Sequence, residues 1–96
     1  MRMLLFPDGE VGYIPLYVDE RRAKVLLRGD VVSIACEHAG RSAQLLVCET
    51  SHGPFNPRAT AISGEYPGRM VFGNAILLTE GDVWDEAHKD EARQGL

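Results

Sequence analysis

Two strongly β-forming runs separated by a short polar loop constrain the fold of this chain more than any other feature. The runs cover residues 30–38 and 43–49, and residues 39–42 lie between them. The first run contains two valines and an isoleucine, the second contains two leucines and a valine, and the connection contains a glycine, as is typical of a β-hairpin. We therefore expect an antiparallel sheet and interpret residues 39–42 as a four-residue hairpin loop.

A second hairpin is predicted at the start of the chain. Residues 2–6 are mostly apolar and are followed by Pro7, Asp8 and Gly9, which together favour a turn because proline presets its own φ and glycine accepts a positive φ. Residues 10–18 then read as a second strand. Since Pro15 cannot donate to a β-ladder, this strand is expected at an edge of the sheet or broken there.

Residues 19–29 have the signals of a short helix. Asp19 is placed to cap the first turn, and Arg28 lies near the negative end of the helix with Gly29 as the terminating residue. The competing interpretation is that residues 23–28 form a strand.

The apolar run over residues 70–79 predicts a central strand, interrupted at Gly73 and Asn74 by a bulge. Asp82 can cap a terminal helix over residues 83–93. The fold class is therefore α+β: a single small domain with a mainly antiparallel sheet of about five strands and one or two short helices. We assign residues 1–81 to this domain and residues 82–96 to an acidic C-terminal helix or tail.

The least strand-like segment, residues 52–62, predicts two proline-guided turns and a short helix. Asn56 is suited to the capping position and Pro57 to the first helical position, so residues 58–62 would be helical and would end before Gly64. Ala59 and Ile62 would face the core, and Arg58 would point outward. The candidate binding surface on this segment consists of His52, Phe55 and Arg58.

Length and composition exclude several classes of protein. Ninety-six residues allow one core, and no apolar run approaches the ~20 residues that a membrane-spanning helix needs. The net charge of −4 gives no support for nucleic-acid binding, and two cysteines are too few for a disulfide scaffold. We expect a cytoplasmic protein with no membrane or nucleic-acid partner.

Two cysteines and two histidines supply the ligand types that zinc prefers, namely Cys36, His38, Cys48 and His52. With the four-residue loop, Cys36 and Cys48 would lie on opposite faces of the hairpin, and only a bulge or an odd-length loop would bring them together. We therefore expect two buried free thiols, no metal site, no cofactor and no catalytic residues.

Several segments, taken in order, resemble a family of small uncharacterised proteins from actinobacterial phages and mobile elements. They are residues 28–32, 46–48, 56–61 and 73–78, and the most specific is the run Asn56-Pro57-Arg58-Ala59-Thr60. The resemblance covers roughly residues 22–81; the start of this chain and its acidic tail differ from the family pattern. It implies an accessory protein of a phage or mobile element, in which the Asn-Pro-Arg segment is a shared structural signature.

These observations favour a non-enzymatic binding module that contacts a host macromolecule, and the expected partner is a protein. One alternative is a small hydrolase or metal-dependent enzyme that uses His38, His52 and a cysteine. Another is a structural homo-oligomer, which would associate through the apolar edge at residues 70–78 or through a helix containing Trp84.

Overall fold

The computed structural model describes residues 2–14, 18–50, 53–63 and 70–79. Five strands and two helices occur in these ranges: β1 (Arg2–Leu5), β2 (Val11–Tyr13), α1 (Glu20–Leu27), β3 (Val31–His38), β4 (Arg41–Cys48), α2 (Pro57–Ser63) and β5 (Ala75–Thr79). The strands form one antiparallel sheet in the order β2-β1-β5-β4-β3. This confirms the α+β fold, whereas the helix expected after residue 82 lies outside the described residues.

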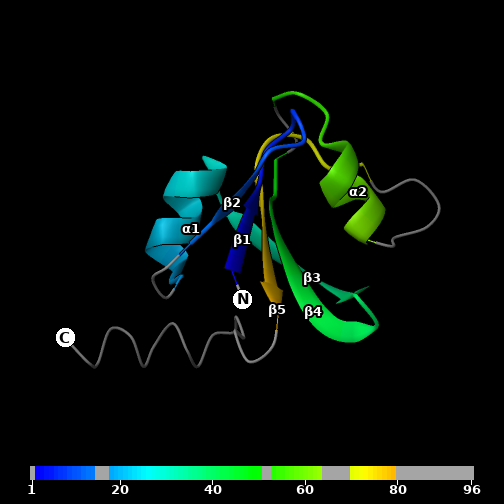
Figure 1. The fold of residues 1–96 in the computed structure, drawn as a ribbon. Helices are drawn as coiled ribbons and strands as arrows, with labels where there is room; N and C mark the ends of the chain where they lie inside the picture. Colours follow the sequence, from blue (N-terminus) through cyan, green and yellow to red (C-terminus); the bar gives the residue numbers. More distant parts are fainter. Residues whose placement is uncertain (1, 15–17, 51–52, 64–69, 80–96) are drawn as a thin grey trace, which may run out of the picture.

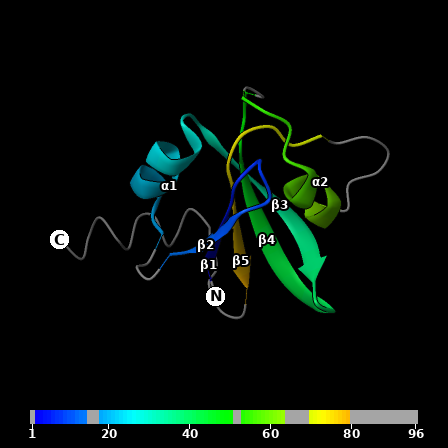
Figure 2. The same cartoon turned by 45° about the horizontal axis from the view of Figure 1, so that its top comes forward.

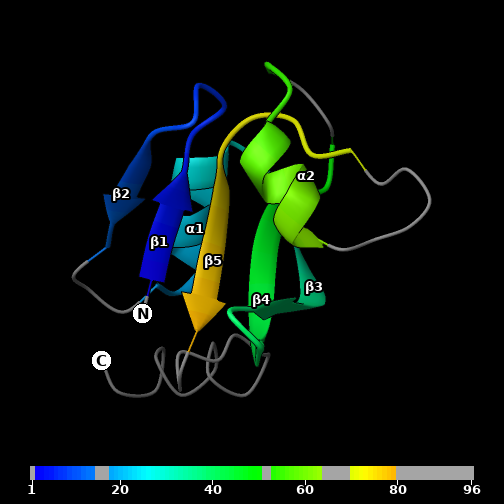
Figure 3. The ribbon, with the colours of Figure 1, turned by 45° about the vertical axis from the view of Figure 1, so that its right-hand side comes forward.

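The sheet is the middle layer of three, with α1 over one face and α2 over the other (Figures 1 and 3). The view in Figure 2 shows the same separation of the two helices. In β4, Leu45 packs into the cluster that contains Ala59 of α2, and Leu46 packs into the cluster that contains Ala23 of α1. Adjacent apolar residues are therefore both buried, which explains why the central strands read as continuous apolar runs.

The hairpin of β3 and β4 has a two-residue loop, so the predicted four-residue loop is wrong. His38 pairs with Arg41, and only Ala39 and Gly40 lie between the strands. Both loop residues have positive φ, 53° for Ala39 and 77° for Gly40. Such a turn matches the right-handed twist of the flanking strands, so residues 41 and 42 continue the strand.

The first hairpin forms at the predicted turn. The Gly9 N–H donates to the Phe6 carbonyl and the Phe6 N–H donates to the Glu10 carbonyl, each at 3.0 Å. Gly9 has φ 94°, a conformation that glycine adopts more readily than other residues because it has no Cβ atom. The second strand is shorter than residues 10–18, because β2 ends at Tyr13, but its predicted place at an edge of the sheet is confirmed.

Helix α1 confirms the predicted helix and excludes the strand interpretation of residues 23–28. The Asp19 carboxylate accepts from the Arg22 N–H at 2.8 Å, as expected of an N-cap. The helix ends one residue earlier than predicted: Arg28, and not Gly29, adopts the left-handed conformation. The Gly29 N–H then donates to the Lys24 carbonyl at 3.1 Å, as in a Schellman motif.

Strand β5 is central, as predicted, but it begins only at Ala75. Instead of forming a bulge, the two preceding residues bond to other elements: the Gly73 N–H donates to the Pro54 carbonyl at 2.7 Å, and the Asn74 amide donates to the Leu26 carbonyl at 3.1 Å. Because β5 pairs with β1 on one side and β4 on the other, it offers no edge for self-association, which corrects that part of the oligomer hypothesis. No helix in the described ranges has the length and apolar character needed to cross a bilayer.

Candidate functional site

The segment that leads into α2 is organised around the side chain of Asn56, which has no exposed surface. Its Oδ1 accepts from the Ala59 N–H at 3.0 Å, which makes Asn56 the N-cap of α2. Its Nδ2 donates to the Leu5 carbonyl at 3.1 Å and to the Gly73 carbonyl at 2.8 Å. One amide side chain thus joins α2 to the ends of β1 and of the segment before β5.

The backbone of Asn56 is also bonded at both of its polar groups. Its N–H donates to the Val71 carbonyl at 2.7 Å, and its carbonyl accepts from the Thr60 N–H at 3.0 Å. A buried polar residue is tolerated when every donor and acceptor is paired, and Asn56 meets that condition. We conclude that Asn56 is a structural residue.

Three further residues of the Asn56–Thr60 run hold α2 in place. Pro57 is the first residue of the helix, where its missing N–H costs no hydrogen bond. Ala59 is completely buried in the core on the α2 face. The Thr60 hydroxyl oxygen accepts from the Val71 N–H at 2.9 Å, which fixes the segment before β5 against the helix.

Arg58 is the exception in this run, because its side chain is exposed, as predicted from the sequence. The Arg58 side chain makes no hydrogen bond or ion pair with the described part of the chain. It also lies in the first turn of α2, which contains no acidic residue. A cation at this end of a helix opposes the helix dipole, so the position of Arg58 does not favour stability.

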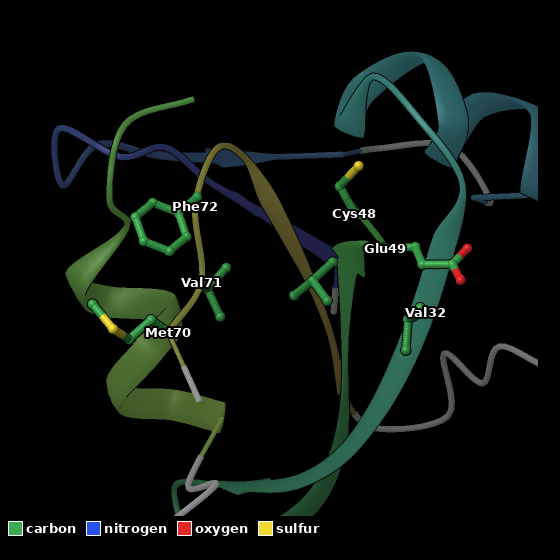
Figure 4. A pocket seen from close by; sticks show the side chains of 7 residues that line it. Val32, Cys48, Glu49, Met70, Val71 and Phe72 are labelled. Atoms are coloured by element: carbon green, nitrogen blue, oxygen red, sulfur yellow. The ribbon is translucent and has the colours of Figure 1, made fainter. Parts of the chain in front are cut away.

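Apolar side chains lie beside this helix start. Phe55 is 43% exposed and Met70 is 53% exposed, although both are large hydrophobic residues. The Phe55 ring meets the Phe72 ring edge to face, with 5.8 Å between centroids. Figure 4 shows Met70 and Phe72 on the α2 side of their segment, whereas Val71 points away from them. We call Phe55, Arg58, Met70 and Phe72 the α2-start surface.

The pocket in Figure 4 lies between the β3–β4 pair and the segment before β5. Its volume is about 60 Å³, which is far below the size of a small-molecule site. Its lining residues are Val32, Val47, Cys48, Glu49, Met70, Val71 and Phe72. Among the described residues that line it, Glu49 is the only charged one.

Two wider hollows are lined in part by Pro54. One, of about 250 Å³, extends between Pro54 and the end of α1 at Arg28. The other, of about 360 Å³, is an open depression lined by Phe6, Pro7, Asp8 and Pro54. The described residues that line these two hollows do not bring together the acid, base and nucleophile that hydrolysis would need.

The two cysteines form no disulfide and lie on opposite faces of the sheet. Cys36 packs against the core on the α2 face, and Cys48 belongs to the core on the α1 face. The predicted four-residue loop would place Cys36 opposite Leu45, whereas Cys36 pairs with Ala43, so the register differs by two residues. A shift by two preserves the face of each side chain, so the predicted separation of the thiols is confirmed.

The surroundings of Cys36 do not favour a nucleophilic thiolate. Burial raises the pKa of the Cys36 thiol above its ordinary value, which favours the unreactive protonated form. Among the described residues, no group of three or more histidine, cysteine and acidic side chains could hold a metal ion. His52, which the metal hypothesis also needs, lies outside these residues.

Of the three predicted binding residues, Phe55 and Arg58 lie at the start of α2 and His52 is outside the described residues. Met70 and Phe72 were missed. The sequence signal was the alternation of residues 70–72, in which Val71 faces the core and its neighbours face the other side. That alternation was hidden because residues 70–79 were read as one central strand.

No family model, curated protein or solved structure matches this chain.

Proposed function

We propose that this chain is a non-enzymatic binding module that contacts a protein partner through the α2-start surface. The observation that carries the proposal is the exposure of Arg58 in a run whose other four residues all serve the fold. A residue that breaks a local rule of stability without a structural gain is typical of a functional position.

The composition of the α2-start surface supports a protein partner. Aromatic residues, methionine and arginine are enriched at protein–protein interfaces, and this surface combines two phenylalanines, a methionine and an arginine. The partner that complements it offers an apolar side chain for Phe55 and Met70 and a carboxylate for Arg58. The resemblance to proteins of phages and mobile elements suggests a host protein as this partner.

Affinity capture followed by titration of the captured, purified protein tests the proposal. Arg58→Glu should weaken binding at least about tenfold, because it removes the cation and repels the partner's carboxylate. Phe55→Ala should also weaken binding through loss of apolar contact.

Arg21→Glu provides a matched control. Arg21 is exposed and is the second residue of α1, as Arg58 is the second residue of α2, so the two changes alter the charge equally at equivalent helix positions. The control should bind as the wild type does. Equal binding by Arg58→Glu, or turnover of a small substrate by the purified protein, would refute the proposed function.

A further inference from the structure

The outer edge of β3 is the longest unpaired strand edge in the described part of the chain. The sheet ends in β2 on one side and β3 on the other, and these strands have three and eight residues. An edge strand presents a row of free N–H and C=O groups that can pair with another strand. With eight residues, β3 can form a ladder with a further strand, whereas β2 is too short for an extended one.

The register of β3 identifies which backbone groups are free. The Glu49 N–H donates to the Asp30 carbonyl at 2.7 Å, and His38 flanks the two-residue turn opposite Arg41. Hydrogen-bonded pairs alternate along an antiparallel ladder, so the even-numbered residues of β3 bond to β4. The N–H and C=O groups of Val31, Ser33, Ala35 and Glu37 consequently point outward from the sheet.

The side chains along this edge do little to prevent pairing. Natural edge strands are protected by proline, by bulges or by charged side chains. β3 contains no proline and pairs with β4 without a bulge, and Glu37 is its only acidic or basic residue apart from the terminal His38. Ser33 and Ala35, at the middle of the edge, are small, uncharged and exposed.

We propose that β3 pairs with β3 of a second copy of this chain, antiparallel and about a two-fold axis at Ile34. In this register Ser33 lies opposite Ala35 of the second copy, and Val31 lies opposite Glu37. All four outward-facing residues then form hydrogen-bonded pairs. If the axis moved by one residue in either direction, one of these four residues would lie opposite a residue outside β3. The ladder would then contain fewer hydrogen-bonded pairs.

The sequence of β3 favours a second copy over a foreign strand, because it is complementary to itself in this register. On the α2 face, Ile34 meets its own copy and Val32 meets Cys36, so apolar side chains face apolar side chains. The two Glu37 carboxylates are kept apart at opposite ends of the ladder. A closed two-fold pair also covers both β3 edges at once.

Sedimentation or light scattering across a concentration series tests the pairing with Ala35→Pro and Ala35→Val. Proline removes an outward N–H at an edge, where a strand tolerates it, and should weaken dimerisation at least about tenfold. Valine keeps the N–H and should leave the dimer intact. A wild-type protein that stays monomeric at high concentration, or a dimer that Ala35→Pro does not weaken, would overturn the proposal.

Amide hydrogen exchange of the wild-type protein gives a second test that needs no variant. The N–H groups of residues 31, 33, 35 and 37 should become protected as concentration rises, whereas those of 32, 34, 36 and 38 should be protected at every concentration. Protection of the odd-numbered amides that does not change with concentration, or their continued exposure in the dimer, would exclude this interface. This interface includes neither Phe55 nor Arg58, so it stands or falls independently of the proposed function.

Discussion

At the scale of single residues, Asn56 and Arg58 show how neighbouring positions can have opposite roles. Asn56 is fully buried, and its side chain makes three hydrogen bonds to three different parts of the chain. Arg58, two residues later, is exposed, and its side chain makes no hydrogen bond or ion pair with the described residues. The first residue specifies the fold, and the side chain of the second lies at the surface.

The role of Asn56 predicts a large loss of stability in Asn56→Ala. This change removes the N-cap of α2 and leaves the carbonyls of Leu5 and Gly73 without their donor. We expect the free energy of unfolding to fall by about 2–4 kcal/mol, measured by urea denaturation. A loss below about 1 kcal/mol would show that Asn56 does not organise the segment.

Asn56→Asp separates the two roles of this side chain, which caps α2 through Oδ1 and donates through Nδ2 to the carbonyls of Leu5 and Gly73. The carboxylate can still cap α2, but it would face two carbonyl oxygens as a buried charge, so at neutral pH this variant should be at least as unstable as Asn56→Ala. Burial raises the pKa of such a carboxyl in the folded state, and stability is lost as pH rises above its unfolded value of about 4. Lowering the pH toward 4 should therefore reduce the difference in unfolding free energy between Asn56→Asp and Asn56→Ala.

At the scale of elements, the end of α1 shows that a helix can terminate without glycine at the left-handed position. Arg28 has φ 61° although Gly29 follows it directly. The Schellman hydrogen bond from Gly29 to Lys24 and the bond from the Asn74 amide to the Leu26 carbonyl satisfy two of the last carbonyls of the helix. These tertiary and local contacts fix the helix end one residue before the glycine.

This geometry predicts that Arg28→Gly stabilises the protein. Glycine adopts positive φ without the steric cost of a Cβ atom, so the unfolding free energy should rise by about 0.5–1 kcal/mol. Gly29→Ala is the control, because Gly29 is not among the glycines with positive φ and should tolerate a Cβ there. A thermal or urea midpoint that falls in Arg28→Gly would contradict this account of the helix end.

At the scale of the whole molecule, the sequence predicted the elements well because local signals define them. Local signals identified the capping residue Asp19, the turn at residues 7–9 and the central strand that ends at Thr79. The prediction of α2 was also correct, with Asn56 as its cap and Pro57 at its first position.

Long-range contacts were not predictable from the same signals. Nothing local indicates that the Asn56 amide reaches the carbonyls of Leu5 and Gly73, or that the Phe55 and Phe72 rings meet. The two-residue turn at Ala39 and Gly40 was missed because alanine rarely adopts positive φ. The candidate surface was therefore predicted only in part, since the positions of Met70 and Phe72 beside α2 are set by contacts between distant parts of the chain.

The central claim is that the Asn56–Thr60 run maintains the fold through every residue except Arg58. Its most direct test is the unfolding free energy of Arg58→Glu measured beside that of Thr60→Val. An acidic residue in the first turn of α2 complements the helix dipole, so Arg58→Glu should be as stable as the wild type or a few tenths of a kcal/mol more stable. Thr60→Val should lose about 1–2 kcal/mol, because the Val71 N–H loses its acceptor. A loss above about 1 kcal/mol in Arg58→Glu would contradict the claim, since it would make Arg58 a structural residue like its neighbours.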